Sequence, residues 1–374
     1  LTPDDYIQPE FEATDEKQPV IPIQQDWGEA WDVSAFYGRS EELAILKQWI
    51  LQDNCRLVGI LGIGGIGKTS LSVKLGEQIQ DQFAYVIWRS LRNAPPLATL
   101  LGELIPFLSN QQQTKVEIGS LLQCLRNARC LVILDNLETI LRSAERAGEY
   151  RPGYEEYGEL MSLVAETRHQ SCLVLTSREK TAEIATFEGI ELAVRSLQLD
   201  GSLEASQALV QAKGLVGTES QKQVLGDRYS HNPLALKIVA ASIRDLFDGE
   251  IGTFLQQDTL LFNGMRRLLE QQFDRLSPLE QSVMNWLAIN REWTTIAQLQ
   301  EDIVPAVSQA KLLEALGGLT WRSLIEKRRD SYTLQPVLLE YVTDRLTEKI
   351  AAELIDVKLL LFTHYALIKT TVKD

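Results

Sequence analysis

Residues 56–70 have the sequence RLVGILGIGGIGKTS, and this stretch decides the fold. Its apolar, β-branched beginning predicts a buried strand, and the pattern G-x-x-x-x-G-K-T between Gly62 and Thr69 predicts a tight turn. Apolar residues then recur at the spacing of one helix face, at Leu71, Leu75 and Ile79. A strand, a glycine-rich loop and a helix in this order form a P-loop. A glycine-rich turn before an ordinary helix is the alternative, but it does not explain why every motif position is filled.

Each part of this segment suits a phosphate group. Glycines permit a tight loop whose N–H groups point inward, and the positive end of the following helix faces the same anion. Lys68 supplies a charge for the β- and γ-phosphates, and the Thr69 hydroxyl can ligate Mg²⁺. The sequence therefore predicts a nucleotide site at Gly62, Gly64, Gly65, Ile66, Gly67, Lys68, Thr69 and Ser70.

Composition limits the class of protein. The chain has 374 residues, 45% of them apolar, which is enough for two or three domains. Its formal net charge of −14 disfavours non-specific binding to nucleic acid or anionic membranes. Four cysteines without C-x-x-C spacing predict buried free thiols. Because no apolar run approaches the ~20 residues of a membrane span and no signal peptide is evident, we expect a soluble cytoplasmic protein.

The first half of the chain alternates between apolar runs and helical segments. The runs cover 57–61, 84–88, 130–134 and 172–176, and their lack of alternation predicts strands that are buried on both faces. Helices are expected at 40–51, 97–108, 118–127 and 157–168. This pattern predicts an α/β domain over residues 31–200, with a parallel sheet between two layers of helices. Residues 1–30, acidic and rich in proline, are expected to form a flexible arm, and the first residue, Leu1, suggests a fragment of a longer protein.

The second half is mainly helical. A small helical subdomain is expected over 201–262, with Asn232 capping a helix that begins at Pro233. Three helices and a hairpin, with strands at 321–327 and 331–334, predict a winged-helix domain over 263–350. Residues 351–374 are expected to form a C-terminal helix or linker toward a sensor region outside this chain.

Polar residues follow the apolar runs at 130–134 and 172–176. Asp135 is placed to hold Mg²⁺ opposite Thr69, although it could instead cap the next segment. The following residue, Asn136, can orient water but cannot accept a proton, which predicts slow hydrolysis. Glu138 is the nearest other carboxylate, and its direction is left open by the sequence.

An arginine follows the next strand. Arg178 can reach a γ-phosphate and report its presence, while a solvated arginine is the alternative. Arg89 is a weaker candidate of the same kind. Because no strand is followed by the N-K-x-D element that guanine selectivity would need, we expect an adenine nucleotide, ADP or ATP with Mg²⁺.

Six motifs in a fixed order give the chain a family resemblance. It resembles the NB-ARC domain of STAND signalling ATPases, and is most similar in wording to cyanobacterial members that carry C-terminal β-propeller repeats. The resemblance spans about residues 35 to 345. The motifs that carry it lie at 36–41, 62–70, 85–88, 134–136, 175–178 and 232–236.

The resemblance implies further site residues. Tyr37, Gly38 and Arg39 would line the adenine pocket, and Pro233 would pack on the base. Arg178 matches the sensor arginine of the family. The winged-helix unit of the family offers a histidine to the ADP β-phosphate, and here Gln335 stands in its place and could donate a hydrogen bond.

Three functions remain open at this stage. The first is a switch that ADP holds closed and that ATP opens for self-association, with slow ATP hydrolysis as the reset. The second is an ATPase motor or a P-loop kinase, although a motor would need an acid at Asn136. The third is a DNA-binding transcription regulator, which rests on the winged helix and on the hairpin tip at Arg328 and Arg329; the acidic chain makes a nucleic-acid partner the less favoured expectation.

Overall fold

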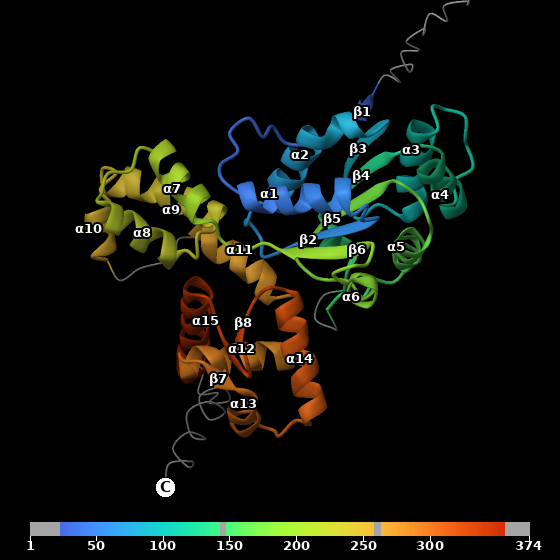
Figure 1. Cartoon of the computed structure of the whole chain (residues 1–374). Helices are drawn as coiled ribbons and strands as arrows, with labels where there is room; N and C mark the ends of the chain where they lie inside the picture. Colours follow the sequence, from blue (N-terminus) through green and yellow to red (C-terminus); the bar gives the residue numbers. More distant parts are fainter. Residues whose placement is uncertain (1–22, 143–146, 258–262, 356–374) are drawn as a thin grey trace, which may run out of the picture.

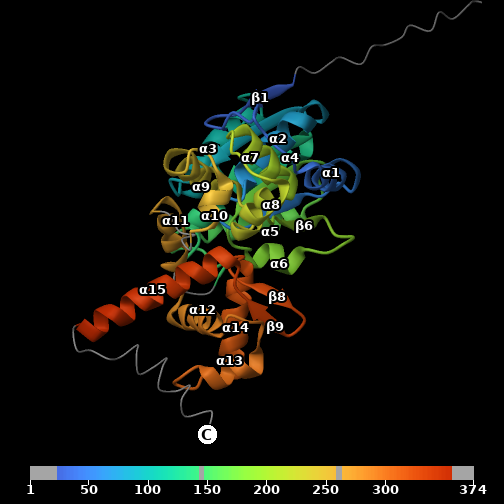
Figure 2. The ribbon, with the colours of Figure 1, turned by 90° about the vertical axis from the view of Figure 1, so that its left-hand side faces the viewer.

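The computed structural model describes residues 23–142, 147–257 and 263–355. Three units follow one another along the chain (Figure 1): a sheet covered by helices, a small bundle of helices beside it, and an orange-to-red unit of helices with a small sheet below both. Turning the molecule shows the last unit still below the other two (Figure 2). The expectations for residues 1–22 and 356–374 lie outside the described residues.

The first unit is built on a parallel sheet, which confirms the predicted fold class. Within the described residues it has six strands in the order β1-β3-β4-β5-β2-β6, and every neighbouring pair is parallel. The P-loop strand β2 is separated from β4 by β5. The strands are β1 (Gln24–Asp26), β2 (Leu57–Leu61), β3 (Tyr85–Ser90), β4 (Cys130–Asp135), β5 (Cys172–Ser177) and β6 (Val194–Gln198).

Successive residues of each central strand enter opposite cores. On β2, Val58 and Ile60 pack with α1 (Ser40–Lys47) and α2 (Lys68–Ile79). Leu57 faces the second core, which a different set of helices covers. All four cysteines are buried free thiols, as predicted. The helices of the second face are α3 (Leu97–Leu108), α4 (Ile118–Asn127), α5 (Glu156–Glu166) and α6 (Ala182–Phe187). Both faces of the sheet are therefore buried, as the apolar runs predicted.

The two edge strands were not expected from the sequence. Gln24–Asp26 pairs with β3 where the end of a flexible arm was expected, because hydrogen bonding along a free sheet edge does not require apolar side chains. Val194–Gln198 is only half-buried and lacks a continuous apolar run. Edge position explains why both strands escaped a search for doubly buried runs.

The second unit consists of α7 (Leu203–Ala212), α8 (Glu219–Arg228), α9 (Pro233–Leu246) and α10 (Ile251–Leu255). Asn232 caps α9 as predicted, because its side chain accepts hydrogen bonds from the amides of Leu234 and Ala235. Pro233 occupies the first helical turn, where its missing N–H costs nothing.

The third unit, predicted to be a winged helix, combines helices with a three-stranded sheet. Its antiparallel sheet has the strand order β7-β9-β8. The strand β7 precedes the last two helices before the hairpin, and β8 and β9 form that hairpin. The predicted strand 321–327 is too long: Trp321 ends α14, whose buried face continues through Leu319, and the strand begins at Glu326. The elements are α11 (Asn263–Phe273), α12 (Pro278–Asn290), β7 (Thr294–Thr295), α13 (Ile296–Asp302), α14 (Gln309–Trp321), β8 (Glu326–Arg328), β9 (Ser331–Thr333) and α15 (Pro336–Ile355).

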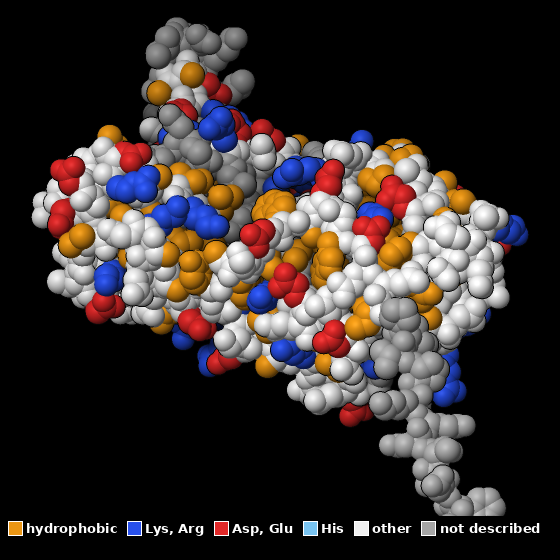
Figure 3. Space-filling view, turned by 90° about the horizontal axis from the view of Figure 1, so that it is seen from above, with side chains coloured by type: hydrophobic (Ala, Val, Ile, Leu, Met, Phe, Trp, Pro, Cys, Tyr) orange, Lys and Arg blue, Asp and Glu red, His pale blue; other side chains and the backbone are white. Residues whose placement is uncertain are grey.

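The surface agrees with the acidic composition. On the face seen in Figure 3, lysine and arginine side chains lie in small groups among acidic ones. Across the described residues, no helix combines the length and the apolar character that crossing a bilayer requires.

Candidate nucleotide-binding site

The loop between β2 and α2 is shaped by its glycines. Gly62, Gly65 and Gly67 have φ of 152°, 80° and 103°, which L-residues with side chains rarely adopt. A Cβ on Gly62 would lie 2.7 Å from the carbonyl oxygen of Leu199. The loop can thus turn tightly, as a loop that wraps around a chain of phosphates must.

Lys68, the first residue of α2, turns back over this loop. Its Nζ donates to the carbonyl oxygens of Gly62 at 2.7 Å and Ile63 at 3.1 Å. Burial lowers the pKa of the Lys68 ammonium to about 8; the charge of Arg178 acts in the same direction, and the carboxylates of Glu138 and Asp135 act against it. A poorly solvated cation at this place gains from an arriving anion.

Asp135 ends β4 and faces α2. Its carboxylate accepts from the Thr69 hydroxyl at 2.8 and 3.1 Å and from the Thr176 hydroxyl at 2.5 Å. Burial raises the pKa of Asp135, and the hydrogen bonds from Thr176 and Thr69 oppose that rise. A hydroxyl and a carboxylate, brought together from two elements, are hard oxygen ligands of the kind that Mg²⁺ prefers, so this donor set fits the metal.

Asn136 supports Asp135. It has a left-handed backbone with φ of 64°, and its side-chain amide donates to Asp135 Oδ2 at 2.8 Å and to Ser90 Oγ at 3.5 Å. Oδ2 of Asp135 therefore accepts a hydrogen bond from an amide. An amide cannot accept a proton from water, which is the chemical reason for the slow hydrolysis expected from the sequence.

Arg178 pairs with the carboxylate whose direction the sequence left open. Its Nε lies 3.0 Å from Oε1 of Glu138, and the side chain of Glu138 is buried. Glu138 belongs to a short 3-10 turn, Leu137–Ile140, that directly follows β4. Because β5 pairs with β4, this turn and Arg178 lie at the same end of the sheet as the P-loop.

Arg89 has a different environment. Its guanidinium pairs with Asp26 of β1 at 2.5 Å and with Glu103 of α3 at 2.6 Å. It fastens the edge strand to the sheet, and both of its acidic partners lie at that edge. The weaker sensor candidate is thus a structural residue.

The segment implied for the adenine pocket packs against the P-loop. Arg39 is buried, and its Nη2 donates to the carbonyl oxygen of Ile66 at 3.1 Å. Gly38 has φ of 65°, and a Cβ there would lie 2.9 Å from the amide nitrogen of Ala205 in α7. Tyr37 is 40% exposed. Gly38 and Arg39 therefore lie between the loop and the helical unit.

The N-terminus of α9 contacts the P-loop directly. The Asn232 side chain donates to the carbonyl oxygen of Gly64 at 3.2 Å, and the Leu234 amide donates to that of Gly65 at 3.3 Å. Pro233 lies between these two contacts in the sequence, next to the loop. The sequence indicated Asn232 only as a helix cap, and its contact with Gly64 depends on tertiary packing.

Gln335 lies farther along, in a cavity shared by all three units. The cavity has a volume of about 890 Å³, and Leu61 at the end of β2 also lines it. The cavity is also lined by Asp200, which follows β6, by His231 of the helical unit, and by Trp293 of the third unit.

The sheet order and the loop geometry define the class: this is a P-loop nucleotide-binding protein. The NB-ARC domain family matches residues 39–215. The resemblance that the motifs indicated is thereby confirmed for residues 39–215, which match the NB-ARC domain.

Two relatives and one solved structure match the chain. An uncharacterized WD repeat-containing protein of Nostoc sp. is 52% identical over 348 residues, which cover 88% of this chain and 28% of that protein. Disease resistance protein RPP2A of Arabidopsis thaliana is 25% identical over 44% of this chain and 13% of its own length. The chain therefore spans less than a third of these relatives. The Walker-type ATPase of Pyrococcus abyssi superposes with a TM-score of 0.55 at 15% identity, covering 82% of this chain and 95% of that one, which shows a shared fold.

Proposed function

We propose that this chain is the nucleotide-operated switch of a larger signalling protein. ADP stabilises a closed arrangement of the three units, and exchange for ATP with Mg²⁺ permits opening and self-association. The observation that carries the proposal is the contact of α9 with the P-loop, through Asn232 on Gly64 and Leu234 on Gly65. A ligand held by that loop would be sensed by the helical unit without any intermediate element.

The chain's own residues divide the work. The loop amides, Lys68 and Ser70 would hold phosphates, while Thr69 and Asp135 would hold Mg²⁺, which supplies charge neutralisation there. Tyr37, Gly38 and Arg39 would border the base on one side and Pro233 on the other. Arg178 would exchange its partner Glu138 for a γ-phosphate. A ligand must contact the two states differently to shift their populations, and Arg178 supplies that difference.

The closest test is limited proteolysis of the purified chain with ADP, with ATP and Mg²⁺, and with no nucleotide. ADP should protect the linkers near residues 200 and 264 more than ATP does, since binding to the closed form stabilises it. Identical digestion in all three conditions would rule the switch out. The nucleotide that copurifies with the chain, released and identified by chromatography, distinguishes ADP from ATP directly.

The variant Gln335→His extends the same comparison of ADP with ATP. Gln335 lines the cavity between the units, and the family resemblance implies a histidine at this position. Histidine can donate to a phosphate and carry a positive charge, so the variant should enlarge the difference between ADP and ATP. Trp293→His, at another wall of the same cavity, is the matched control and should leave the difference as in the wild type.

A further inference from the structure

Buried and half-buried charges connect the winged-helix unit to the nucleotide site. They alternate in sign, and we call them the charge chain. It runs from the first unit to the third through Arg178, Glu138, Arg275, Glu179, Arg322 and Glu280.

The link from the nucleotide side is Arg275, in the turn between α11 and α12. Its Nη2 donates to the carbonyl oxygen of Glu138 at 3.0 Å and to Oε1 of Glu179 at 2.9 Å, and its Nε donates to the same Oε1 at 3.2 Å. One guanidinium of the third unit thus touches two residues of the first. Both adjoin the sensor: Glu138 pairs with Arg178, and Glu179 follows it in the sequence.

The link on the winged-helix side is Arg322, just after α14. Its side chain lies 3.4 Å from Oε1 of Glu179 and pairs closely with Glu280 at the start of α12. Arg322, Glu179 and Glu280 are 3%, 2% and 4% exposed. At such burial the charges are held by one another, and removing one partner leaves a costly unpaired charge.

From this arrangement we infer that the charge chain transmits the state of Arg178 to the winged-helix unit. The inference rests on the proposed function. When Arg178 turns toward a γ-phosphate, Glu138 loses its guanidinium partner. The guanidinium of Arg275 already donates to the carbonyl oxygen of Glu138, so it is close enough to pair with the Glu138 carboxylate instead. When Arg275 pairs with that carboxylate it leaves Glu179, and the contact between the two units weakens.

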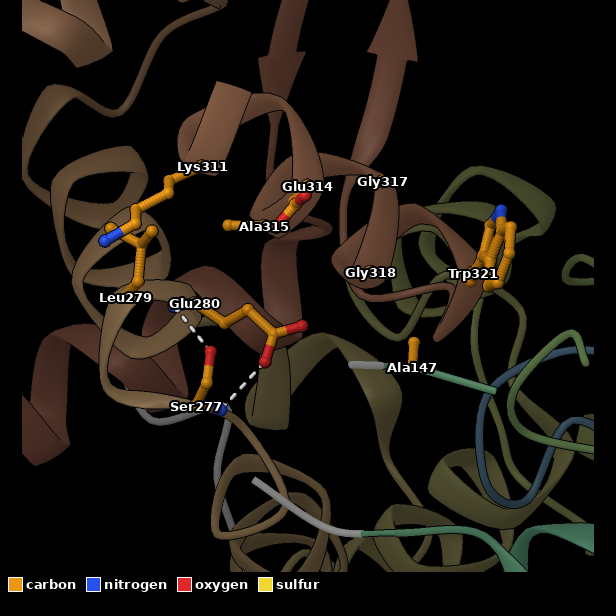
Figure 4. Close-up of a pocket in the computed structure, with 10 residues that line it drawn as sticks. All are labelled: Ala147, Ser277, Leu279, Glu280, Lys311, Glu314, Ala315, Gly317, Gly318 and Trp321. Atoms are coloured by element: carbon orange, nitrogen blue, oxygen red, sulfur yellow. Dashed lines mark hydrogen bonds between the residues drawn. The ribbon is translucent and has the colours of Figure 1, made fainter. Parts of the chain in front are cut away.

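The far end of the charge chain keeps its pairing when the two units separate. Glu280 borders a cavity of about 540 Å³ between α12 and α14, and Figure 4 shows its carboxylate at the wall, hydrogen-bonded to Ser277. Arg322 and Glu280 both belong to the third unit, so their pair stays intact when the contact with Glu179 opens. Glu179 is buried in the first unit, so the cost of breaking the chain falls on the nucleotide side, where the signal arises.

The test uses Arg275→Ala and measures the ratio of ADP to ATP affinity by calorimetry, with Mg²⁺ present. Coupling of 5- to 150-fold is usual between linked sites. We expect the variant to shift the ratio at least about fivefold from the wild-type value. Arg345→Ala is the matched control: Arg345 has nearly the same exposure and pairs with Asp274, the neighbour of Arg275, within the third unit. It should leave the ratio unchanged.

Two further variants separate coupling from simple docking. Glu179→Gln keeps the side-chain volume and removes the charge, so it should fold and shift the ratio in the same direction as Arg275→Ala. In a double-mutant cycle, Arg178→Ala with Arg275→Ala should change the ratio less than the two single effects together. If the wild type distinguishes ADP from ATP but Arg275→Ala and Glu179→Gln do so equally well, the inference fails and the switch survives. A wild type without any nucleotide preference would refute both.

Discussion

The Thr69 hydroxyl donates to Asp135 with 2.8 Å between Oγ1 and Oδ1, and this bond joins the start of α2 to the end of β4. The two residues are 66 positions apart, and β5 separates their strands in the sheet. Only the fold brings them together. A hydroxyl and a carboxylate in contact are the pair that a Mg²⁺ ion bridging to a phosphate would use.

Asp135→Asn should therefore weaken nucleotide binding only where Mg²⁺ contributes. An amide oxygen keeps the shape but loses the charge, and changes of this size around a metal site cost roughly 10- to 100-fold in affinity. Calorimetric titration of ATP with Mg²⁺ and with EDTA measures the difference. Asp26→Asn, which alters the edge pair with Arg89, is the control. If Asp135→Asn weakens ATP equally under both conditions, the metal role is wrong.

Lys68 predicts a pH dependence of binding. Because burial lowers its pKa to about 8, the free protein loses this charge as the pH rises above 8, whereas a bound phosphate favours the protonated amine. Affinity for ADP should fall between pH 8 and 10, and binding there should take up a proton. Calorimetry at pH 8.5 in buffers of different ionisation enthalpy measures that uptake. Lys68→Arg, which stays charged, should abolish it.

The stability of the free protein should change in the opposite direction. The pKa of Lys68 is lower in the folded chain than in the unfolded one, where it is near 10.5, so the unfolded state binds more protons between these values. The contribution of Lys68 to the free energy of unfolding therefore rises with pH from about 8 to 10.5. Chemical denaturation without nucleotide, compared with Lys68→Met, isolates this contribution.

The sequence predicted whatever depends on local pattern. The four central strands are doubly buried runs, and the P-loop, Asp135 and the cap at Asn232 are short motifs with fixed chemistry. It could not predict β1, because QQD carries no apolar signal and pairs only through its backbone. The sequence also could not predict that the Glu138 side chain points toward Arg178, because a short 3-10 turn determines its direction.

Contacts between units were the least predictable. Arg275, Arg322 and Glu179 are ordinary charged residues in the sequence, and only the docking of the third unit brings them together. Pairing across units has no period and no fixed spacing. Arg39 is a similar case: its position was implied by the resemblance, but its bond to Ile66 follows from packing.

Turnover should be slow. Asn136 occupies the place of an acid, and Glu138 is held by Arg178, so the described site offers no free carboxylate beside Asp135. We expect hydrolysis well below the ~1–10³ s⁻¹ of typical enzymes. Asn136→Asp should raise the rate, because a carboxylate can accept a proton. The backbone φ of 64° at Asn136 is tolerated by aspartate as well as by asparagine. Steady turnover of tens per second in the wild type would favour a motor instead.

Gly65→Ala should detach the helical unit from the P-loop. The φ of Gly65 is 80°, and a Cβ there would lie 2.5 Å from Cβ of Leu234, a distance that neither residue can relieve by rotating its side chain. The N-terminus of α9 must move, and the hydrogen bond from the Leu234 amide to Gly65 must break. Hydrogen exchange should therefore speed up at Leu234, and ADP should stabilise the variant against heat less than it stabilises the wild type.

Gly67→Ala separates the clash from backbone strain. Gly67 has φ of 103°, yet a Cβ there would meet nothing within 4 Å, so the variant carries the strain without the collision. It should keep the slow exchange at Leu234. Leu234→Gly combined with Gly65→Ala removes the opposing Cβ and should restore part of the protection. If both glycine variants accelerate exchange at Leu234 equally, strain in the loop is responsible, and the contact between α9 and the P-loop does not control the position of the helical unit.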